Sequence, residues 1–416
     1  MKKFNTIFAS AIFLILIVHC PLTVDNCEAQ SGWQLITPPP TVEDLYSVFF
    51  YDANTGWAAG ENGTILKTTN GASNWSILQQ SAQIELYSVF FTDLNTGWAA
   101  GEGGTVIRTV NGGTNWTSQV SGLIGFISSV FFINSNTGWA AGQNGIIYTT
   151  NGGANWMPQN SGTANTLISI FFKNAEVGWS AGYLGTILKT TNGGAGWITQ
   201  NSGVGEYLRS VYFTDLNTGW IVGDIGTILK TTNGGSNWIT QSSGGTMFLQ
   251  SVFFIDANTG WISGNSGTLL KTTNSGSNWN SQISNTTELL ISVYFVSSLT
   301  GYAAGFSGTI LKTTNGGSTF IVNSESGIPE KYSLSQNFPN PFNPVTNLKF
   351  GIPDFGFVSL KVFNLLGKEV TTLVNERLSS GNYKVEFNGS NLPSGVYFYK
   401  LALDEFTYTK RMMLIK

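Results

Sequence analysis

The chain repeats one segment of about 41 residues seven times in succession. Each copy carries a Gly-Trp dipeptide, which becomes Gly-Tyr in the last copy. The steps between successive marker aromatics are 41, 41, 40, 41, 41 and 41 residues. A unit of this size cannot bury its apolar face alone, so the copies must pack against one another. The markers are Trp57, Trp98, Trp139, Trp179, Trp220, Trp261 and Tyr302.

Each copy divides into four short segments that are typical of β-strands. In the clearest copy, residues 208–241, the predicted strands are 210–213, 220–222, 227–231 and 238–241. Turns rich in Gly and Asn separate them, and no segment has helical periodicity. Four-stranded units of this length, repeated several times, are typical of β-propeller blades. We therefore predict an all-β chain that begins with a seven-bladed β-propeller of four-stranded blades.

Two segments compete for the position that closes the predicted ring. Trp33 precedes the first complete copy and resembles the start of a fourth strand, which would pair with the last blade. This pairing would remove an exposed sheet edge. The segment around Phe320 could occupy the same position, so both remain open. Core packing is the predicted role of all 13 tryptophans, and truncating one should cost about 3–5 kcal/mol.

The third turn of each copy has a recognisable form, Ser/Thr-x-Asp/Asn-x-Gly-x-x-Trp. It is similar to the Asp-box of bacterial neuraminidase repeats. The resemblance implies a structural hairpin on the face opposite the ligand site, in which the Asn side chain bonds the turn backbone. Clear examples of this residue are Asn111, Asn151, Asn192 and Asn233.

The fuller pattern is G-W-x-x-G-x-x-G-T-I-L-K-T-T-N-G-G-x-x-W, and it spans roughly residues 31–322. It resembles the propellers of the photosystem II assembly and stability factor family. The resemblance implies a seven-bladed, non-enzymatic binding scaffold.

Residues 1–29 have the pattern of a signal peptide: Lys2 and Lys3, then a short apolar run, then Ala29 at a suitable cleavage site. The apolar run is too short to span a bilayer, so no transmembrane segment is expected in the mature chain. A lipoprotein site at Cys20 is disfavoured because His19 stands where a small residue is expected. Cleavage after Ala29 would remove every Cys and His, which argues against catalysis or zinc binding through these residue types.

Residues 30–327 are assigned to the propeller, and a composition shift begins a C-terminal domain at residues 328–416. Its strand-like segments are 358–363, 381–387, 395–401 and 410–416, which predict a small immunoglobulin-like β-sandwich. Three ordered motifs, N-F-P-N-P-F-N-P, V-x-N-L-L-G-K-E-V and L-P-S-G-V-Y, resemble the type A sorting domain of the type IX secretion system. That resemblance implies export through the periplasm and outer membrane, with the secretion machinery as a partner. An ordinary adhesion module is the alternative.

Charge and turn chemistry limit the possible partners. Residues 31–330 hold 15 acidic and 8 basic residues, a net charge of −7, so nucleic acid is not expected to bind there. The turn at residues 52–56 resembles half a calcium loop but lacks the downstream Glu, so we predict an Asx turn and no metal or cofactor. A row of basic residues in the third strands is predicted to pack along aromatic rings.

The copies differ most at two positions, the start of the loop between strands two and three and the residue just before the first-strand Ser. In a propeller meander both positions lie on one face, around the mouth of the central channel. We therefore predict a ligand surface there. Its proposed residues are Tyr46, Glu61, Tyr87, Glu102, Gln143, Tyr183, Arg209, Asp224 and Gln250. The alternative is that loop tips vary freely because nothing constrains them.

Three functions remain after the sialidase mechanism is set aside. The resemblance to sialidases would imply three arginines that hold the substrate carboxylate, and the repeats contain only Arg108 and Arg209. The preferred function is a secreted or cell-surface, monomeric, non-catalytic propeller that binds a protein or glycan. The alternative is a glycoside hydrolase that uses two carboxylates from Glu61, Glu102 and Asp224. A passive surface scaffold is the third.

Overall fold

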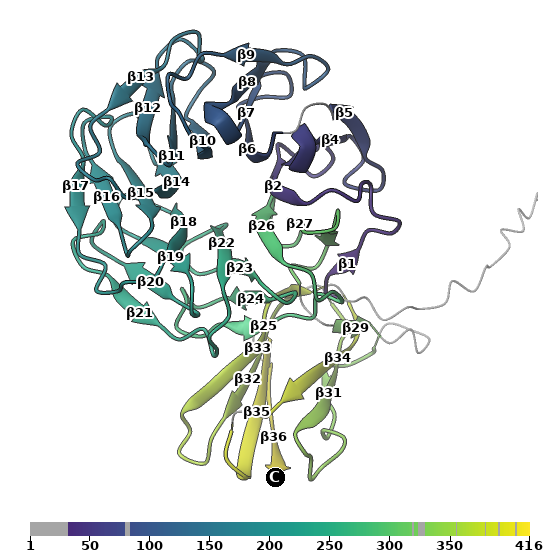
Figure 1. Ribbon diagram of the computed structural model, residues 1–416. Helices are drawn as coiled ribbons and strands as arrows, with labels where there is room; N and C mark the ends of the chain where they lie inside the picture. Colours follow the sequence, from purple (N-terminus) through teal and green to yellow (C-terminus); the bar gives the residue numbers. More distant parts are fainter. Residues whose placement is uncertain are drawn as a thin grey trace, which may run out of the picture.

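A computed structural model describes residues 32–79, 84–317, 320–322, 329–354, 356–378, 380–389, 392–403 and 406–416. Within these residues, seven four-stranded sheets form a ring and two more form a C-terminal sandwich (Figure 1). The all-β propeller class is therefore confirmed. The signal peptide lies outside the described residues. The domain limits near residues 30 and 328 stay predictions.

The blades follow one another along the chain. The first contains β2 (Leu45–Phe50), β3 (Gly56–Gly60), β4 (Ile65–Thr68) and β5 (Ser76–Gln79). The second contains β6 (Leu86–Phe91), β7 (Gly97–Gly101), β8 (Val106–Thr109) and β9 (Thr117–Gln119). The third contains β10 (Ile127–Phe132), β11 (Gly138–Gly142), β12 (Gly145–Thr149) and β13 (Met157–Gln159). The fourth contains β14 (Leu167–Phe172), β15 (Gly178–Gly182), β16 (Ile187–Thr190) and β17 (Ile198–Gln200).

The remaining blades have the same order. The fifth contains β18 (Leu208–Phe213), β19 (Gly219–Gly223), β20 (Ile228–Thr231) and β21 (Ile239–Gln241). The sixth contains β22 (Leu249–Phe254), β23 (Gly260–Gly264), β24 (Leu269–Thr272) and β25 (Asn280–Ser281). The seventh contains β26 (Leu290–Phe295), β27 (Gly301–Gly305) and β28 (Ile310–Thr313), and its outer strand is β1 (Gln34–Leu35). Two short 3-10 turns, η1 (Glu61–Gly63) and η2 (Glu102–Gly104), follow β3 and β7.

The segment after Trp33 closes the ring. Strand β1 pairs antiparallel with β28, with Gln34 opposite Lys312. Trp33 itself is fully buried and meets Phe295 edge-on at 5.6 Å between ring centroids. Phe320 belongs to β29 (Phe320–Val322), which pairs with a strand of the sandwich. The closure by Trp33 is thus confirmed, and the alternative through Phe320 is wrong.

The recurring Gly-Trp dipeptide joins each blade to its neighbour. Trp57 stacks on Phe91 of the next blade at 3.6 Å between ring centroids, and its Nε1–H donates to the carbonyl of Gly112 at 3.1 Å. The ring of Phe91 also lies over Gly97, where a Cβ would approach it to 2.5 Å. The Gly therefore leaves room for the Phe ring on which the preceding Trp stacks. The same stack recurs at 3.5–3.6 Å in Trp98–Phe132, Trp139–Phe172, Trp179–Phe213, Trp220–Phe254, Trp261–Phe295 and Tyr302–Phe50.

The turns behave as their sequences predict. In the second blade, Asn111 Oδ1 accepts the N–H of Asn115 at 2.9 Å and the hydroxyl of Thr109 at 3.0 Å. Asn70, Asn151, Asn192, Asn233 and Asn274 make the equivalent backbone bonds. The basic row also packs as predicted, with the cation 5.2–5.7 Å from the marker ring in Lys67–Trp57, Arg108–Trp98, Lys189–Trp179, Lys230–Trp220 and Lys271–Trp261.

Aspartates in the turns between the first and second strands of the blades make the stability of the propeller sensitive to acid. Burial tends to raise the pKa of Asp93, but hydrogen bonds from Asn95 and Thr96 outweigh it and lower that pKa below the usual value; Asp215 behaves alike. A lowered folded-state pKa gives stability that is complete above the unfolded pKa and is lost as pH falls through the folded one. We expect the Asp93→Asn, Asp215→Asn variant to lose less stability than the unaltered protein between pH 7 and pH 3. Urea unfolding across that range measures this, and identical losses would contradict it.

The C-terminal sandwich contains two four-stranded sheets that share one core. One has the order β29-β34-β31-β30, with β30 (Ser333–Leu334), β31 (Val345–Ile352) and β34 (Gly381–Asn388). The other has the order β33-β32-β35-β36, with β32 (Gly356–Phe363), β33 (Glu369–Leu378), β35 (Gly395–Leu403) and β36 (Phe406–Leu414). Leu348, Val385, Leu360 and Tyr399 are among the buried residues between them. The four predicted strands are present, but the sequence analysis missed β31 and β33.

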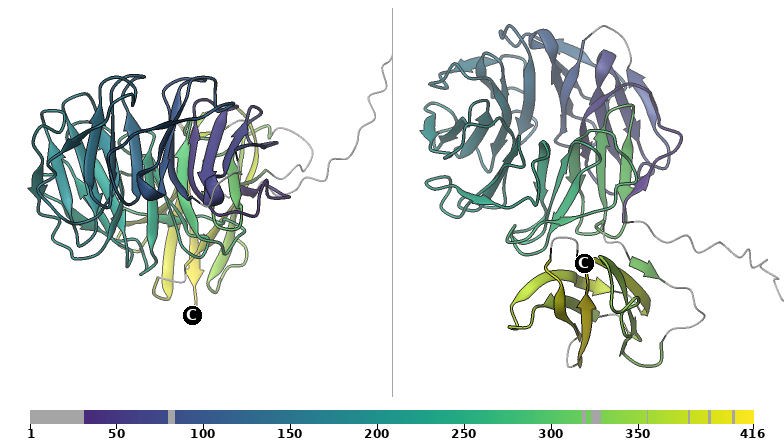
Figure 2. Two further views of the ribbon diagram at one scale, coloured as in Figure 1. Left: turned by 45° about the horizontal axis from the view of Figure 1, so that its top comes forward. Right: turned by 60° about the horizontal axis from the view of Figure 1, so that its bottom comes forward.

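The sandwich lies beside the ring, close to the sixth and seventh blades (Figure 2). The hydroxyl of Thr371 in the sandwich donates to Asn280 Oδ1 of the sixth blade at 3.2 Å. Within the sandwich, the Asn337 side chain at the start of the N-F-P-N-P-F-N-P motif is buried and bonds the Pro339 carbonyl at 3.0 Å. The motif therefore has a structural role in the fold of this domain.

Candidate ligand-binding site at the channel mouth

Seven equivalent backbone hydrogen bonds bring the variable positions to one face. In the second blade, Glu102 N–H donates to the carbonyl of Glu85 at 2.9 Å, which ties the two-to-three loop to the connection that enters the first strand of the same blade. The corresponding bond in the fifth blade runs from Asp224 to Tyr207, also at 2.9 Å. At the opposite edge, Gly71 N–H bonds the carbonyl of Asn54, so the Asp-box turns lie beside the one-to-two turns. The predicted division into two faces is confirmed.

A β-bulge in each first strand points one variable residue toward the channel. The pairing register shifts between Leu208 and Ser210, which leaves Arg209 as the extra residue in its ladder. Bulges commonly redirect a side chain in this way. The same shift occurs in all seven first strands and affects Tyr46, Tyr87, Ser128, Ile168, Arg209, Gln250 and Ile291.

These bulge residues line a cavity of about 430 Å³ at the channel mouth. Five of the nine proposed ligand residues contribute to its lining. They are Tyr46, Tyr87, Tyr183, Arg209 and Gln250. Sequence reasoning missed Phe126, which also lines the cavity. It belongs to a third variable column, the residue before each first strand, which comparison of the copies could have revealed.

The other four proposed residues lie outside the cavity lining. Glu61 and Glu102 begin the 3-10 turns η1 and η2, and Glu102 and Gln143 are exposed. Asp224 accepts hydrogen bonds from Arg209 Nε and, at 3.1 Å, from its Nη2. A role in ligand binding stays a prediction for all nine residues.

Two closed rings of side chains follow the bulge residues along the first strands, and several serines of the first ring line the cavity. Each first-strand Ser accepts a backbone N–H from the following blade, as Ser47 does from Val89 at 3.2 Å. The ring of serines is Ser47, Ser88, Ser129, Ser169, Ser210, Ser251 and Ser292. Two residues further along the strands lies an aromatic belt with neighbouring centroids 5.0–5.2 Å apart. The belt is Phe49, Phe90, Phe131, Phe171, Tyr212, Phe253 and Tyr294.

One side of the mouth combines tyrosines with carboxylates. The rings of Tyr46 and Tyr87 lie 5.4 Å apart, and the hydroxyl of Tyr87 donates to Glu85 Oε2 at 2.5 Å. Burial, followed by the negative charges of Glu85, Asp44 and Glu61, raises the pKa of Tyr46 well above its usual value. Burial and the bond to Glu85 do the same for the pKa of Tyr87. Both phenols are therefore neutral in a region of negative potential.

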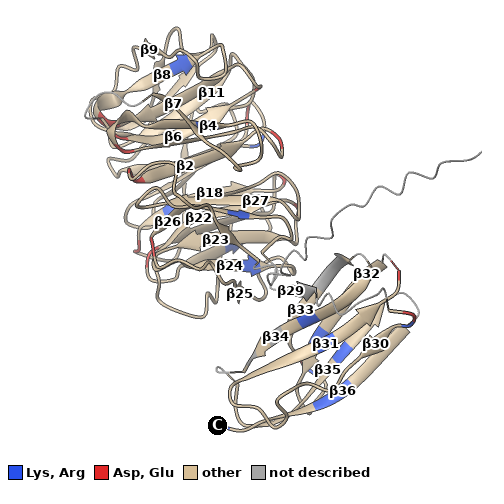
Figure 3. Ribbon diagram, turned by 90° about the vertical axis from the view of Figure 1, so that its right-hand side faces the viewer, with Lys and Arg blue, Asp and Glu red and all other residues tan. Residues whose placement is uncertain are grey.

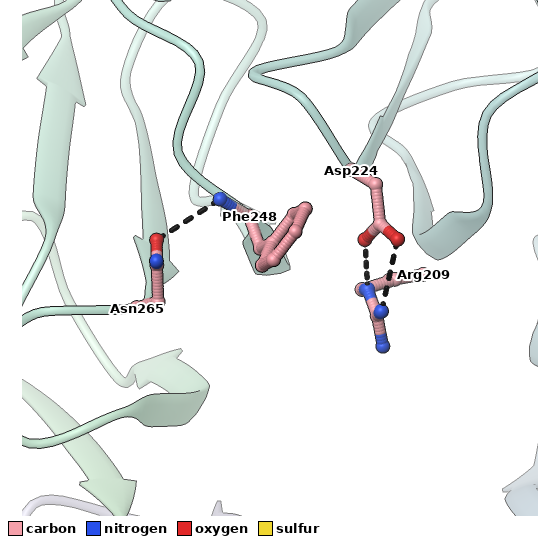
Figure 4. Close-up of polar contacts among 4 residues, drawn as sticks. All are labelled: Arg209, Asp224, Phe248 and Asn265. Carbon is pink, nitrogen blue, oxygen red and sulfur yellow. Dashed lines mark hydrogen bonds and ion pairs between the residues drawn. The ribbon is translucent and has the colours of Figure 1, made fainter.

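The opposite side is aromatic and carries one ion pair. Figure 4 shows Arg209 against Asp224, with the ring of Phe248 nearby. Asn265 Oδ1 fixes the adjacent backbone by accepting the N–H of Phe248 at 2.9 Å. Around the rim, Tyr183 stacks on Tyr207 with centroids 4.0 Å apart. Since Asp224 neutralises Arg209, this pair contributes little net charge.

Acidic residues of the propeller lie in its loops, whereas its basic residues lie mostly on strands (Figure 3).

Among the described residues, no group of three or more His, Cys, Asp or Glu side chains could hold a metal ion. No helix in this part of the chain is long and apolar enough to cross a membrane. The mouth thus offers aromatic, amide and carboxylate groups to a ligand.

Comparison with known proteins gives a family for each part. The model of the photosynthesis system II assembly factor YCF48 matches residues 25–159, 148–247 and 196–289. Together these three matches cover more than half of the chain. Residues 336–416 match the secretion system C-terminal sorting domain. A search of curated proteins finds no match.

Solved structures share the propeller fold. YCF48 bound to a D1 peptide has 21% identity and a TM-score of 0.59, over 68% of this chain and 97% of that chain. PorZ, a surface component of the type IX secretion system of Porphyromonas gingivalis, has 12% identity and a TM-score of 0.53, over 91% and 60%. A GH74 enzyme from Niastella koreensis has 12% identity and a TM-score of 0.57, over 91% and 67%.

These low identities establish the fold alone, whereas the two family models establish membership. The sorting domain also fixes the destination, because it marks a protein exported to the cell surface or beyond. The chain belongs to the YCF48 photosynthesis system II assembly factor family and is a secreted or cell-surface protein with a C-terminal sorting domain.

Proposed function

We propose that this protein is a non-catalytic propeller that binds a macromolecular ligand, a protein or a glycan, at its channel mouth. One observation carries the proposal: five side chains from positions that differ among the blades surround one cavity. The fixed residues of the repeat have structural roles instead, as in the Trp–Phe stacks between blades. Support also comes from the relative that was solved with a bound peptide.

The shape of the site suits a ligand that approaches from outside. Aromatic and amide side chains line the cavity, and such groups give both contact area and directional hydrogen bonds. The aromatic belt lies beneath, and burial raises the pKa of Tyr294 in that belt to about 12, so its hydroxyl stays neutral. A ligand would therefore rest on the mouth and insert one group into the cavity.

A glycoside hydrolase is the second candidate, and it is favoured by the carboxylates at the rim. Glu61 and Glu102 begin equivalent loops in neighbouring blades, and the GH74 enzyme shows that the fold can support such chemistry. Asp224 is the weakest member of this set, because its two oxygens already bind Arg209.

Peptide and glycan arrays, with hydrolysis followed in parallel, separate these functions. We expect binding without turnover, and a loss of about tenfold in affinity or more for Tyr87→Ala and Tyr183→Ala, since both side chains line the cavity. Ile239→Ala, on the exposed outer strand β21, serves as the matched control. Unchanged binding in both mouth variants would rule the proposal out, and turnover lost in Glu102→Gln would favour the hydrolase.

A further inference from the structure

Two exposed apolar residues at the mouth have backbone conformations that such residues rarely adopt. Leu184 and Ile225 have φ values of 54° and 55°, and their side chains are 63% and 57% exposed. A left-handed backbone is unfavourable for residues of this kind, and most of all for a β-branched one. Smaller or more polar residues occupy the same loop position in other blades, namely Asn62, Gly103, Ser266 and Ser307.

These two residues extend an aromatic surface on the fourth to sixth blades. We define the apolar ridge as Leu184, Tyr207, Ile225 and Phe248, in which Tyr207 and Phe248 are 38% and 45% exposed. Tyr183 links the ridge to the cavity, because it lines the cavity and stacks on Tyr207. Exposed apolar patches bordered by polar residues are typical of binding surfaces. The ridge therefore gives a reason for the retained strain.

The other half of the mouth has the opposite chemistry. The tyrosine pair, Tyr46 and Tyr87, lies among the carboxylates of Asp44, Glu61 and Glu85. Their negative charges raise the pKa of one or both phenols, and Glu85 also accepts the hydroxyl of Tyr87. Among the described residues, Arg209 is the basic residue that lines the cavity, and Asp224 neutralises it. Aromatic faces together with carboxylates attract a cation through ring quadrupoles and direct charge.

We propose that the mouth binds an extended protein segment through two unlike side chains. A Lys or Arg side chain enters the cavity beside the tyrosine pair, and a neighbouring apolar side chain rests on the apolar ridge. This inference rests on the proposed function and names the ligand class. A neutral glycan is the poorer match, because it supplies neither a cation for the carboxylates nor an aliphatic side chain for Leu184 and Ile225. The net charge of −7 over residues 31–330 favours the same partner.

The test uses the full chain and an array of capped Gly-Ser peptides. One set carries a Lys or Arg and a Leu at varied spacing, a second has Glu in place of the basic residue, and a third has Ser in place of Leu. A glycan array is measured beside them. We expect only the first set to bind, and its binding to weaken as NaCl is raised.

Two variants address the two halves of the site. Glu61→Gln with Glu85→Gln keeps the hydrogen-bond acceptors but removes two charges, and it should weaken the basic peptides about threefold to tenfold. Ile225→Asn should weaken binding by a similar factor while raising the melting temperature by about 2 °C or more, because Asn tolerates the left-handed backbone. A gain in stability excludes misfolding as the cause of lost binding.

Matched controls lie on the Asp-box face. Val110→Asn replaces an apolar side chain of similar exposure, 65%, and Glu176→Gln removes an exposed charge there. Both should leave binding unchanged. If Lys and Glu peptides bind equally, or only glycans bind in a manner sensitive to the mouth variants, this inference is overturned while the proposed function stands. If neither array binds, both are overturned.

Discussion

Replacing Trp179 with alanine should lower the free energy of unfolding by about 3–5 kcal/mol. Its indole is fully buried, stacks on Phe213 of the next blade at 3.6 Å, and donates to the Gly234 carbonyl at 3.1 Å. Truncation removes the stack and the hydrogen bond together, and it leaves a void between two blades. Because blades contact only their neighbours, the loss weakens the ring at that junction. Equilibrium unfolding in urea, followed by fluorescence and circular dichroism, measures the change.

Two variants separate the contributions at this junction. Trp179→Phe keeps an aromatic ring and loses the indole hydrogen bond, so it should cost about 1–2 kcal/mol. Trp238→Ala removes a half-buried indole that meets the same Phe213 edge-on, with centroids 5.9 Å apart, and it should cost less than Trp179→Ala. Equal costs for Trp179→Ala and Trp238→Ala would show that the stack between blades is not the main source of stability.

Replacing Gly223 with alanine should destabilise the fifth blade by roughly 1–3 kcal/mol and also weaken ligand binding. A Cβ at this position would lie 2.1 Å from the carbonyl oxygen of Tyr207, a backbone atom that cannot move alone. That carbonyl accepts the N–H of Asp224, so the bond that holds the mouth loop would be displaced. Thermal unfolding and the binding measurement should change together in this variant.

Gly205→Ala is the matched control for that substitution. Gly205 lies on the connection that precedes the same blade, and no atom lies within 4 Å of the place its Cβ would occupy. We expect stability to be unchanged or to rise by up to about 1 kcal/mol, since alanine restricts the unfolded chain. If both glycine variants behaved alike, close approach of the backbone would not explain the second Gly of the repeat.

The period of the sequence was enough to predict the ring and its four-stranded blades, whereas the segment that closes the ring was left open between Trp33 and Phe320. This worked because each fixed residue satisfies a local requirement that repeats. Gly97 makes room for Phe91, and Asn111 bonds its own turn. The sandwich contains no repeated copies that could be compared with one another, and the strands β31 and β33 were missed.

The site was harder to predict because variation among the copies does not reveal where a side chain points. Gln143 and Gln250 are both variable glutamines on the same face, yet only Gln250 lines the cavity. The difference is that Gln250 is the extra residue of a β-bulge, whereas Gln143 begins an exposed loop. A bulge depends on pairing between two strands, so inspection of one strand does not reveal it. The strain at Ile225 was invisible for a similar reason.

The closure of the seventh blade also determines how the protein would carry a mechanical load. Strand β28, from which the chain leaves the ring toward the sandwich, is covered on both edges, by β27 and by β1. A pull on the sandwich therefore acts on an interior strand with hydrogen bonds on both sides, and the force spreads over two ladders. Traction from a surface-held tail would thus be resisted jointly by the first and last strands of the propeller.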